Sequence, residues 1–482
     1  MPHEPDGVID YGATPYGTVA APTDTNVGSL IAGRRWIDFN LTYSFTDSAS
    51  DYGAGYRTNT AGFSALSAQQ EVSARYWFNQ YASVSGLTFT ELDGASGALD
   101  EDQEATIRMA NGTNINPTQT AIGYYPWSDE EAGDIWFEGT GDNPALGNFD
   151  WATVGHEIGH ALGLSHAHTT ATGSTILESQ VNFTGYSIMT YLSYVGSTAG
   201  YNTNVYGHDP QSLMIYDIAA TQYLYGANFN SNSGNTTYTF STANGEMFIN
   251  GVGQGIPLAN VVYRTIWDGN GNDTYDLSNY GTNLLIDLRP GNYSNFDVGG
   301  YFQRADLDRT SASTDRWSPG HLFNALQFEN DARSLIENAI GGSGNDTLHG
   351  NAANNTLTGN GGTDWMYGYD GNDTLNGSGA DRMYGGAGID TLRITAGVFT
   401  GRLDGGADAD RILLNGLGSF DLNNTVVQLS SIEEVEFSAA NVGLRQFTIT
   451  SRELDSATEV PTNFRIDFNA NGALAVDQFY VF

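Results

Sequence analysis

Apolar residues recur with two different periods along the first half of the chain, and these periods predict its elements. Residues 67–85 show roughly helical spacing, whereas residues 87–92 alternate as a strand does. Two more helices are expected over 150–164, with Asp150 as a candidate N-cap, and over 212–224. Further strands are expected at 105–109, 121–127 and 134–137. This mixture predicts an α/β domain.

Changes of composition divide the chain into three parts. Residues 1–33 are rich in Gly, Pro, Thr and Ala and predict a mobile extension, with packing beginning near Trp36. Their position also suggests a short pro-segment. The expected α/β domain covers 34–228, and Gly, Asn, Asp and Thr dominate 229–482. From about Thr395 onward, alternating apolar residues predict antiparallel strands.

A nine-residue period runs through the glycine-rich part. Its clearest unit is Gly341-Gly-Ser-Gly-Asn-Asp346-Thr-Leu348-His, and a degenerate unit begins at Gly405. The sixth position holds Asp346, Asn355, Asp364, Asp373 and Asp390, with Asp381 in a shortened unit. The eighth position holds Leu348, Leu357, Met366, Leu375 and Leu392.

This period predicts a calcium-binding parallel β-roll. Glycines permit tight half-turns whose carbonyls and one carboxylate are hard oxygen ligands, and the apolar residue two positions later points into a thin core. A flexible linker would not need a phased apolar residue. Asp268, Gly271 and Asp273 resemble one further calcium loop with different spacing.

Charge and cysteine content narrow the partners. The 482 residues carry 18 basic and 55 acidic side chains, a formal charge of -37, which argues against nucleic acid or an anionic membrane and favours cations. For the scattered carboxylates, a merely soluble acidic surface is the simpler explanation. Without cysteine there is no disulfide and no thiolate metal site. Neither a secretory signal peptide nor a membrane span is visible, which alone would suggest a cytoplasmic protein.

One motif, His156-Glu-Ile-Gly-His160-Ala-Leu-Gly163-Leu-Ser-His166, predicts a catalytic zinc site. Residues four apart share one helix face, so His156 and His160 can bind one ion. Gly163 lets the chain leave the helix sharply and brings His166 back as a third ligand. Glu157 can then take a proton from a water at the open position. A single one of these histidines would more simply be structural, but the five fixed positions together would not.

The extended motif resembles that of the metzincin metalloproteases, and Ser187-Ile-Met189-Thr-Tyr191 is similar to their Met-turn. With the repeats, the resemblance narrows to the serralysins, secreted bacterial endopeptidases that carry RTX repeats. It implies an α/β metzincin catalytic domain followed by an all-β calcium-binding parallel β-roll with antiparallel β-sandwich elements. It also implies that Met189 forms a floor beneath the zinc ligands. Tyr191 would bind zinc at rest and swing away to stabilise the oxyanion, although without the resemblance a buried core tyrosine would be the simpler interpretation.

The resemblance also implies calcium ligands at the second, fourth and sixth positions of each repeat, and a carboxylate, Glu337, that opens the row. The corresponding residues are Gly342, Gly344, Asp346, Asn351, Ala353, Asn355, Asn360, Gly362, Asp364, Tyr369, Gly371, Asp373, Gly386, Gly388 and Asp390.

Secretion is a further implication of the resemblance. Serralysins leave the cell through a type I ABC transporter that reads an uncleaved C-terminal signal, and residues 477–482 resemble that signal. We therefore expect an extracellular monomer. Ala167 departs from the proline that most serralysins carry after the third histidine, and we interpret His168 as lying outside the zinc ligand set.

The sequence thus predicts a zinc endopeptidase that cleaves internal bonds of extended protein or peptide substrates, with Glu157 as general base. The substrate is expected to pair with an edge strand at 134–137. The main alternative is a calcium-dependent RTX surface or adhesion protein with an inactive metal domain. A different zinc hydrolase on an RTX scaffold is disfavoured by the Met-turn.

Overall fold

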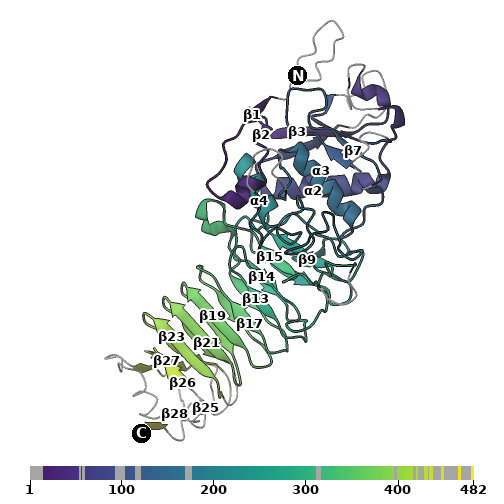
Figure 1. Ribbon diagram of the computed structural model, residues 1–482. Helices are drawn as coiled ribbons and strands as arrows, with labels where there is room; N and C mark the ends of the chain where they lie inside the picture. Colours follow the sequence, from purple (N-terminus) through teal and green to yellow (C-terminus); the bar gives the residue numbers. More distant parts are fainter. Residues whose placement is uncertain are drawn as a thin grey trace. The chain divides into compact units, whose positions relative to one another are not determined.

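The protein forms two units in a computed structural model (Figure 1). The first unit comprises Met1–Ser231, Gly255–Gly269 and Arg304–Ser318, and the second comprises Asn232–Gln254, Asn270–Gln303 and Pro319–Phe482. The predicted division differs, because two segments beyond residue 228 belong to the first unit. The structure describes residues 15–53, 56, 60–92, 104–113, 121–139, 141–168, 176–310, 316–395, 399–415, 420–421, 428–432, 434–437, 447–449, 465–467 and 479–481.

The first unit is built on a five-stranded sheet of order β4-β3-β5-β7-β6. All neighbours are parallel except β6, which runs antiparallel to β7. The sheet strands are β3 (Asn40–Phe45), β4 (Thr88–Glu91), β5 (Ile107–Asn111), β6 (Ala121–Gly123) and β7 (Ile135–Phe137). The other elements are β1 (Tyr16–Thr18), α1 (Thr25–Ser29), β2 (Arg34–Trp36), η1 (Ala49–Tyr52), η2 (Thr60–Gly62), α2 (Ala68–Val84), α3 (Phe149–Ala161), α4 (Ile215–Tyr225) and β11 (Arg264–Ile266). An α/β unit was predicted and is present.

The predicted edge strand at 134–137 is wrong. Strand β7 lies inside the sheet, between β5 and β6, and all three of its residues are buried. Among the described strands, β6 forms this edge. The edge could not be read from the sequence because strand order is set by tertiary pairing rather than by local pattern.

Helices α2 and α3 pack closely because α3 presents glycine to α2. A Cβ on Gly155 would lie 2.5 Å from the Trp77 ring, so only glycine allows this approach. The Trp77 indole N–H donates to the Trp151 carbonyl at 2.7 Å, and the Tyr81 hydroxyl donates to the Gly155 carbonyl at 2.9 Å. These bonds fix the register of α3 against α2.

Helix α3 begins one residue earlier than expected. Its N-cap is Asn148, whose Oδ1 accepts a hydrogen bond from the Trp151 N–H at 2.8 Å. The expected cap, Asp150, instead accepts from the N–H groups of Gly141 and Asn143. Both side chains are good caps, and the loop before the helix decides between them.

The described part of the predicted extension is packed rather than mobile. Residues 15–33 include β1 and α1, and Val27, Leu30 and Ile31 are buried. Ile31 bridges to Leu164, just beyond α3. Packing therefore begins well before Trp36; residues 1–14 lie outside the described part.

The second unit consists mainly of parallel strands that alternate between two sheets. The eleven-stranded sheet has the order β10-β9-β8-β12-β16-β18-β20-β22-β24-β27-β29, and the six-stranded sheet has the order β13-β17-β19-β21-β23-β26. Strands of the first sheet are β8 (Thr237–Phe240), β9 (Met247–Ile249), β10 (Val252–Gly253), β12 (Thr274–Asp276), β16 (Asn338–Ile340), β18 (Thr356–Thr358), β20 (Thr374–Gly377), β22 (Thr391–Ile394), β24 (Arg411–Leu414), β27 (Glu434–Phe437) and β29 (Arg465–Asp467). Strands of the second sheet are β13 (Leu285–Asp287), β17 (Thr347–His349), β19 (Trp365–Asp370), β21 (Arg382–Ala387), β23 (Arg402–Ala407) and β26 (Gln428–Ser430).

Each repeat contributes one strand, and successive repeats enter opposite sheets. The row β17, β19, β21, β23 in Figure 1 belongs to one of these sheets. The eighth residue of each repeat was expected to point inward, and this is confirmed. Leu348, Leu357, Met366, Leu375 and Leu392 are all fully buried. Leu348 aligns with Met366 in one sheet and Leu357 with Leu375 in the other.

The expectation of antiparallel strands after Thr395 is wrong. The described pairs beyond this point, including those of β25 (Phe420–Asp421), β28 (Phe447–Ile449) and β30 (Phe479–Val481), are parallel. Antiparallel pairs occur earlier in the second unit, between β8, β9 and β10 and between β14 (Tyr293–Ser294) and β15 (Leu322–Asn324). Alternating residues indicate a strand but not its direction. Two short helices, η4 (Phe328–Asn330) and η5 (Ala332–Ser334), precede β16.

We predict that deletion of residues 1–33 unfolds the first unit, whereas deletion of residues 1–14 does not. The longer deletion removes the buried side chains of Val27, Leu30 and Ile31, each contributing about 1.5–3 kcal/mol. A loss on the order of 5 kcal/mol is comparable to the whole stability of a domain. Thermal unfolding of both variants checks this, and equal melting temperatures would contradict it.

Candidate metal centre

Helix α3 carries His156 and His160 on one face, and the chain beyond it returns His166 to the same point. Gly163 makes the reversal with φ of +97°, and a Cβ there would collide with the Arg34 carbonyl. The last carbonyls of the helix, which have no partner within it, accept bonds from distant donors. These are the Trp36 indole to Ala161 at 2.8 Å, the Tyr225 hydroxyl to Leu162 at 2.7 Å and the Ala32 N–H to Gly163 at 2.9 Å.

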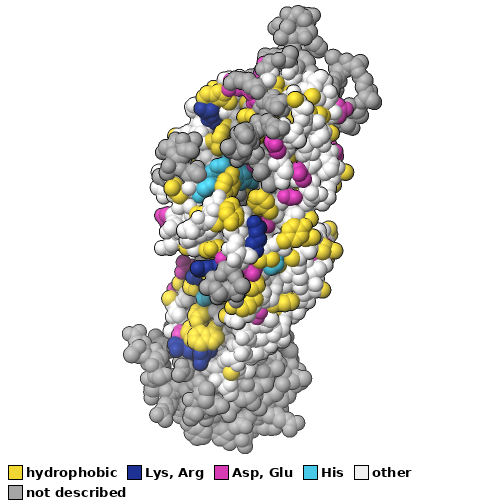
Figure 2. All heavy atoms as spheres, turned by 45° about the vertical axis from the view of Figure 1, so that its right-hand side comes forward, with side chains coloured by type: hydrophobic (Ala, Val, Ile, Leu, Met, Phe, Trp, Pro, Cys, Tyr) yellow, Lys and Arg dark blue, Asp and Glu magenta, His cyan; other side chains and the backbone are white. Residues whose placement is uncertain are grey.

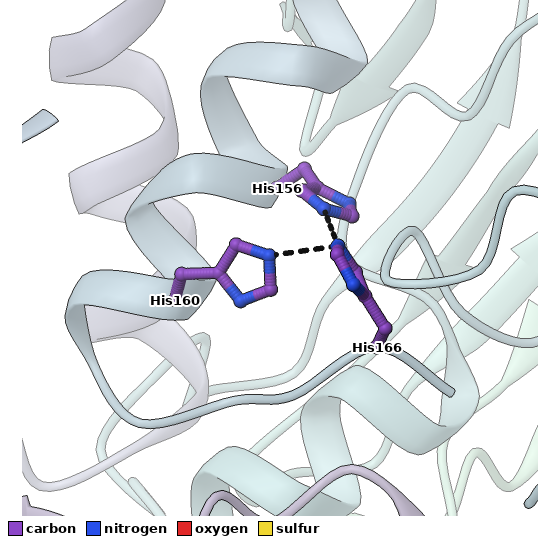
Figure 3. Close-up of side chains that lie close together, drawn as sticks. All are labelled: His156, His160 and His166. Atoms are coloured by element: carbon purple, nitrogen blue, oxygen red, sulfur yellow. Dashed lines mark hydrogen bonds between the residues drawn. The ribbon is translucent and has the colours of Figure 1, made fainter. Parts of the chain in front are cut away.

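The three imidazoles converge through their Nε2 atoms (Figure 3). Nε2 of His166 lies 3.1 Å from Nε2 of His156 and 3.0 Å from Nε2 of His160. Within the described residues, this is the group of His, Asp or Glu side chains whose ligand atoms gather within 4.8 Å of one another. His156 and His160 are buried and His166 is partly exposed; Figure 2 shows histidine side chains at the surface next to hydrophobic ones.

Hydrogen bonds on the far side of two rings decide which nitrogen carries the proton. Nδ1 of His156 donates to the Ile188 carbonyl at 2.8 Å, and Nδ1 of His160 donates to the Leu164 carbonyl at 2.7 Å. Their Nε2 atoms therefore present lone pairs to the centre. Burial, followed by the neighbouring imidazoles, lowers the pKa of His160 to about 3 and that of His166 to about 2. The rings are neutral, as metal ligands must be.

Zinc fits this donor set. Neutral nitrogens about 2.0–2.1 Å from a tetrahedral zinc lie about 3.3 Å apart, close to the separations of the Nε2 atoms. The Nε2 lone pairs of His156 and His160 point to a common centre, where one cation can accept both. Three protein nitrogens also leave the fourth position open, as in catalytic rather than structural zinc sites.

Glu157, on the turn between the first two histidines, is buried beside the edge strand. Burial raises its pKa to about 8, and a hydrogen bond from the Gly123 N–H opposes this rise. A Cβ on Gly123 would collide with the Glu157 carbonyl, so glycine is required at this position of β6. The negative charge of Glu157 also raises the pKa of Tyr125, second to burial. The Tyr125 ring packs edge-on against His160 with centroids 5.3 Å apart.

Tyr191 completes the group of predicted residues that the fold brings together. Its hydroxyl oxygen lies 2.9 Å from Nε2 of His166, and its ring stacks near His156. Burial raises its pKa well above the ordinary value, so it remains a donor. His168 does not join the three converging nitrogens. Its Nδ1 accepts the Tyr191 N–H at 3.3 Å, and its ring lies against the Tyr191 ring.

The segment around Met189 is held by a buried carboxylate of α4. Asp217 accepts from the N–H of Ile188 at 2.8 Å, from the N–H of Met214 at 2.9 Å and from the Ser187 hydroxyl at 2.6 Å. Because the Ile188 carbonyl receives Nδ1–H of His156, Asp217 orients a histidine through the backbone of one residue, Ile188. Burial raises the pKa of Asp217 to about 6.

Two contacts place Met189 itself. It is fully buried, and a Cβ on Gly159 would lie 2.8 Å from its sulfur, so it packs directly against α3. Its carbonyl accepts the N–H of Ala167 at 3.2 Å. The proline that most serralysins carry at this position has no N–H and could not make this bond. Ala167 therefore adds a hydrogen bond between the residue after His166 and Met189.

In the second unit, the sixth residues of the repeats form two hydrogen-bonded rows. The Asp346 N–H donates to Asp364 and the Asp364 N–H to Asp381, both at 2.9 Å. On the other side, the N–H groups of Asn355, Asp373 and Asp390 donate to the carboxylates of Asp373, Asp390 and Asp410 at 2.7–2.8 Å.

These rows leave buried carboxylate oxygens without a hydrogen-bond partner in the described part of the chain. Within the described residues, the Oδ2 atoms of Asp364, Asp373 and Asp390 are buried without a hydrogen-bond partner. Burial raises the pKa of these carboxyls to about 8, 7 and 6, respectively. Buried carboxylate oxygens beside backbone carbonyls fit calcium, which takes oxygen ligands.

The other predicted calcium residues are less uniform. Gly362, Gly371, Gly386 and Gly388 have positive φ, as do Asn360 and Tyr369. Asp346 accepts the N–H groups of Leu284 and Gly342, and Glu337 accepts the N–H of Asp273 at 2.7 Å. Asp268 belongs to the first unit, whereas Gly271 and Asp273 belong to the second.

Comparison with known proteins agrees with both halves of this description. A family model described as the RTX calcium-binding nonapeptide repeat matches residues 340–375 and 377–392. A second, described as the peptidase M10 serralysin C terminal, matches residues 227–309. The resemblance to the serralysins is confirmed.

The similarity to serralysins extends across most of the chain. Serralysin G of Dickeya chrysanthemi is 32% identical over 327 residues, covering 64% of this chain and 59% of that protein. Serralysin C of the same organism is 33% identical over 360 residues, covering 71% and 66%. Metallopeptidase AprA of Pseudomonas marginalis is 30% identical over 323 residues, covering 65% and 60%. The matched part is thus about three fifths to two thirds of the length of these relatives.

Sequence reasoning missed three residues of the metal centre. Gly123 and Tyr125 lie in and after a short strand, and Asp217 lies in a helix whose apolar pattern hides its role. Their importance comes from tertiary contacts with Glu157, His160 and Ile188. The charged residue in an apolar helix was the one available hint for Asp217, since a buried carboxylate needs partners.

We predict that Asp217→Ala lowers zinc affinity about 10- to 100-fold, the range for partners that orient metal ligands. The variant loses the acceptors for Ile188 and Met214, so His156 loses its fixed carbonyl. Asp217→Asn is the matched control, because an amide oxygen can still accept both N–H groups. Competition with a zinc chelator measures the affinity, and equal affinities in the alanine variant and the wild type would count against this role.

Proposed function

We propose that this protein is a secreted zinc endopeptidase with a metzincin-type catalytic domain and a calcium-binding β-roll. The observation that carries the proposal is the convergence of three neutral Nε2 atoms beside a buried carboxylate and a tyrosine hydroxyl. The serralysin relatives support the same activity. His156, His160 and His166 would hold zinc, with Tyr191 as a further ligand at rest.

Zinc bound there would supply Lewis acidity, polarising a peptide carbonyl and lowering the pKa of a bound water. Glu157 acts as the general base that takes the water's proton and then delivers one to the leaving amine. The hydrogen bond from the Gly123 N–H and the burial of the Glu157 side chain hold its carboxylate in one orientation. Proton transfer therefore needs no rearrangement of the base.

Tyr191 supplies a donor for the negative charge that develops on the carbonyl oxygen. Its side chain is 36% exposed, and its hydroxyl is held by His166. Its partial exposure leaves the hydroxyl room to turn toward substrate. Packing of the ring against His168 keeps it near the centre.

An extended substrate pairs with β6, the strand at the edge of the sheet. The β6 residues Ala121–Gly123 pair with β7 on one side, which leaves the other side for a peptide. Because the Gly123 N–H contacts Glu157, this strand reaches the catalytic carboxylate. Main-chain pairing favours broad specificity for protein and peptide substrates.

Calcium bound to the repeats stabilises the second unit once the protein is outside the cell. Calcium neutralises the buried carboxylates of the rows, and the chain is exported by a type I ABC system that reads its C-terminal residues. Of that predicted signal, Phe479–Val481 of β30 is within the described residues. No helix in the described part of the chain has the length and apolarity to span a bilayer. We propose a monomer.

We predict that Glu157→Gln retains zinc and loses at least about 1000-fold in kcat on casein. The variant keeps every ligand and removes the base. Zinc content and turnover, measured on the same sample, check this. Near-normal turnover would exclude the endopeptidase mechanism, and zinc-independent adhesion with no protease activity in the wild type would favour the alternative of an inactive metal domain.

We predict that Tyr191→Phe lowers kcat about 10- to 1000-fold with little change in KM, as expected for one oxyanion donor. The phenyl ring keeps the packing against His156 and His168, so the fold is preserved. Steady-state kinetics on a peptide substrate separate the two constants. A change confined to KM would contradict the role.

A further inference from the structure

The turn formed by residues 350–355 differs from its neighbours at the sixth position. Asn355 stands where the other regular repeats carry aspartate. Asn351 and Asn355 are both buried, with 4% and 1% exposure. Two buried amides must satisfy four N–H hydrogens and two oxygens, so their partners reveal what the turn contains.

Asn355 is fully paired with protein atoms. Its Oδ1 accepts the Asn351 N–H at 2.6 Å, and its Nδ2 donates to the Glu337 carbonyl at 3.0 Å and to Asn351 Oδ1 at 3.1 Å. A backbone N–H can only donate and a carbonyl can only accept, so these partners fix the orientation of the amide.

Asn351 is fully paired as well. Its Nδ2 donates to the carbonyls of Ile336 at 2.7 Å and Leu288 at 3.1 Å, and its Oδ1 accepts the Ala353 N–H at 2.9 Å. The four amide hydrogens of the two asparagines thus point at three backbone carbonyls and one amide oxygen. These hydrogens carry the partial positive charge that a cation would otherwise bring to such oxygens.

The turns that end in Asp364, Asp373 and Asp390 have the opposite character. Each has a buried carboxylate oxygen without a hydrogen-bond partner. Their second and fourth residues have positive φ, from 66° at Asn360 to 124° at Gly386. Neither Asn351 nor Ala353 has positive φ. Backbone conformation and side-chain pairing therefore separate residues 350–355 from the turns that fit calcium.

Residues 332–337 precede β16, and residues 350–355 precede its neighbour β18. We infer that the space between these two turns, which we call the 337/355 step, binds no calcium and is filled by the side-chain amides of Asn351 and Asn355. The side chain of Asn355 is then not a calcium ligand, in contrast to the role that the family resemblance implies. The inference rests on the proposed calcium binding of the other turns. It makes this step of the second unit insensitive to calcium concentration.

Calcium content of the full-length protein tests this inference. Asn355→Ala should keep the wild-type number of bound ions while lowering the melting temperature by several degrees. The matched control, Asp373→Ala, should lose at least one ion. Loss of an ion from Asn355→Ala overturns the inference. A wild-type protein that binds no calcium would instead refute the proposed calcium binding itself.

Anomalous diffraction from calcium in wild-type crystals gives a second answer that does not depend on a variant folding. We expect peaks beside Asp364, Asp373 and Asp390 and none between Glu337 and the Asn355 amide. A calcium peak at the latter position overturns the inference.

Discussion

Buried electron pairs that gather where a cation can bind are the constraint on which this molecule depends. In the first unit, carbonyls of Ile188 and Leu164 take the Nδ1 hydrogens of two histidines, so lone pairs of Nε2 meet at the centre. In the second unit, carboxylate oxygens of the repeats are buried without partners. Both arrangements are costly unless a cation is present. The two halves of the chain thus solve one electrostatic problem with a soft nitrogen set for zinc and a hard oxygen set for calcium.

Support for the metal centre comes from parts of the chain that are far apart in sequence. Donors on Ala32, Trp36 and Tyr225 satisfy the last carbonyls of α3, and Asp217 holds the peptide that orients His156. The Ala167 N–H then ties the histidine loop to Met189. A ligand set that must converge within a few tenths of an ångström needs such support, because side chains on an isolated helix and loop would sample many rotamers.

The sequence predicts features that depend on local spacing and fails where tertiary pairing decides. Two histidines four apart share a helix face wherever the helix packs, and a nine-residue period fixes which side chains point inward, so both predictions needed no partner. The edge strand depends on the pairing of β6 with β7, and strand direction after Thr395 depends on the neighbouring turns. Asp217 gains its role only through contact with Ile188. The sequence shows that Asn355 replaces the aspartate of the other repeats. Only the structure shows why this matters, because the Asn351 and Asn355 amides donate to the carbonyls of Ile336 and Glu337.

The carboxylate rows of the second unit have a direction. The N–H of Asp346 donates to Asp364 and that of Asp364 to Asp381, while Asp373 donates to Asp390 and Asp390 to Asp410. Each turn thus obtains its acceptor from a turn later in the chain. A stack that grows toward the C-terminus ends in an N–H donor that still lacks its acceptor, whereas a stack that grows toward the N-terminus ends in a carboxylate that still lacks its donor. The two ends of each row therefore differ in polarity, with an acceptor at the N-terminal end and a donor at the C-terminal end.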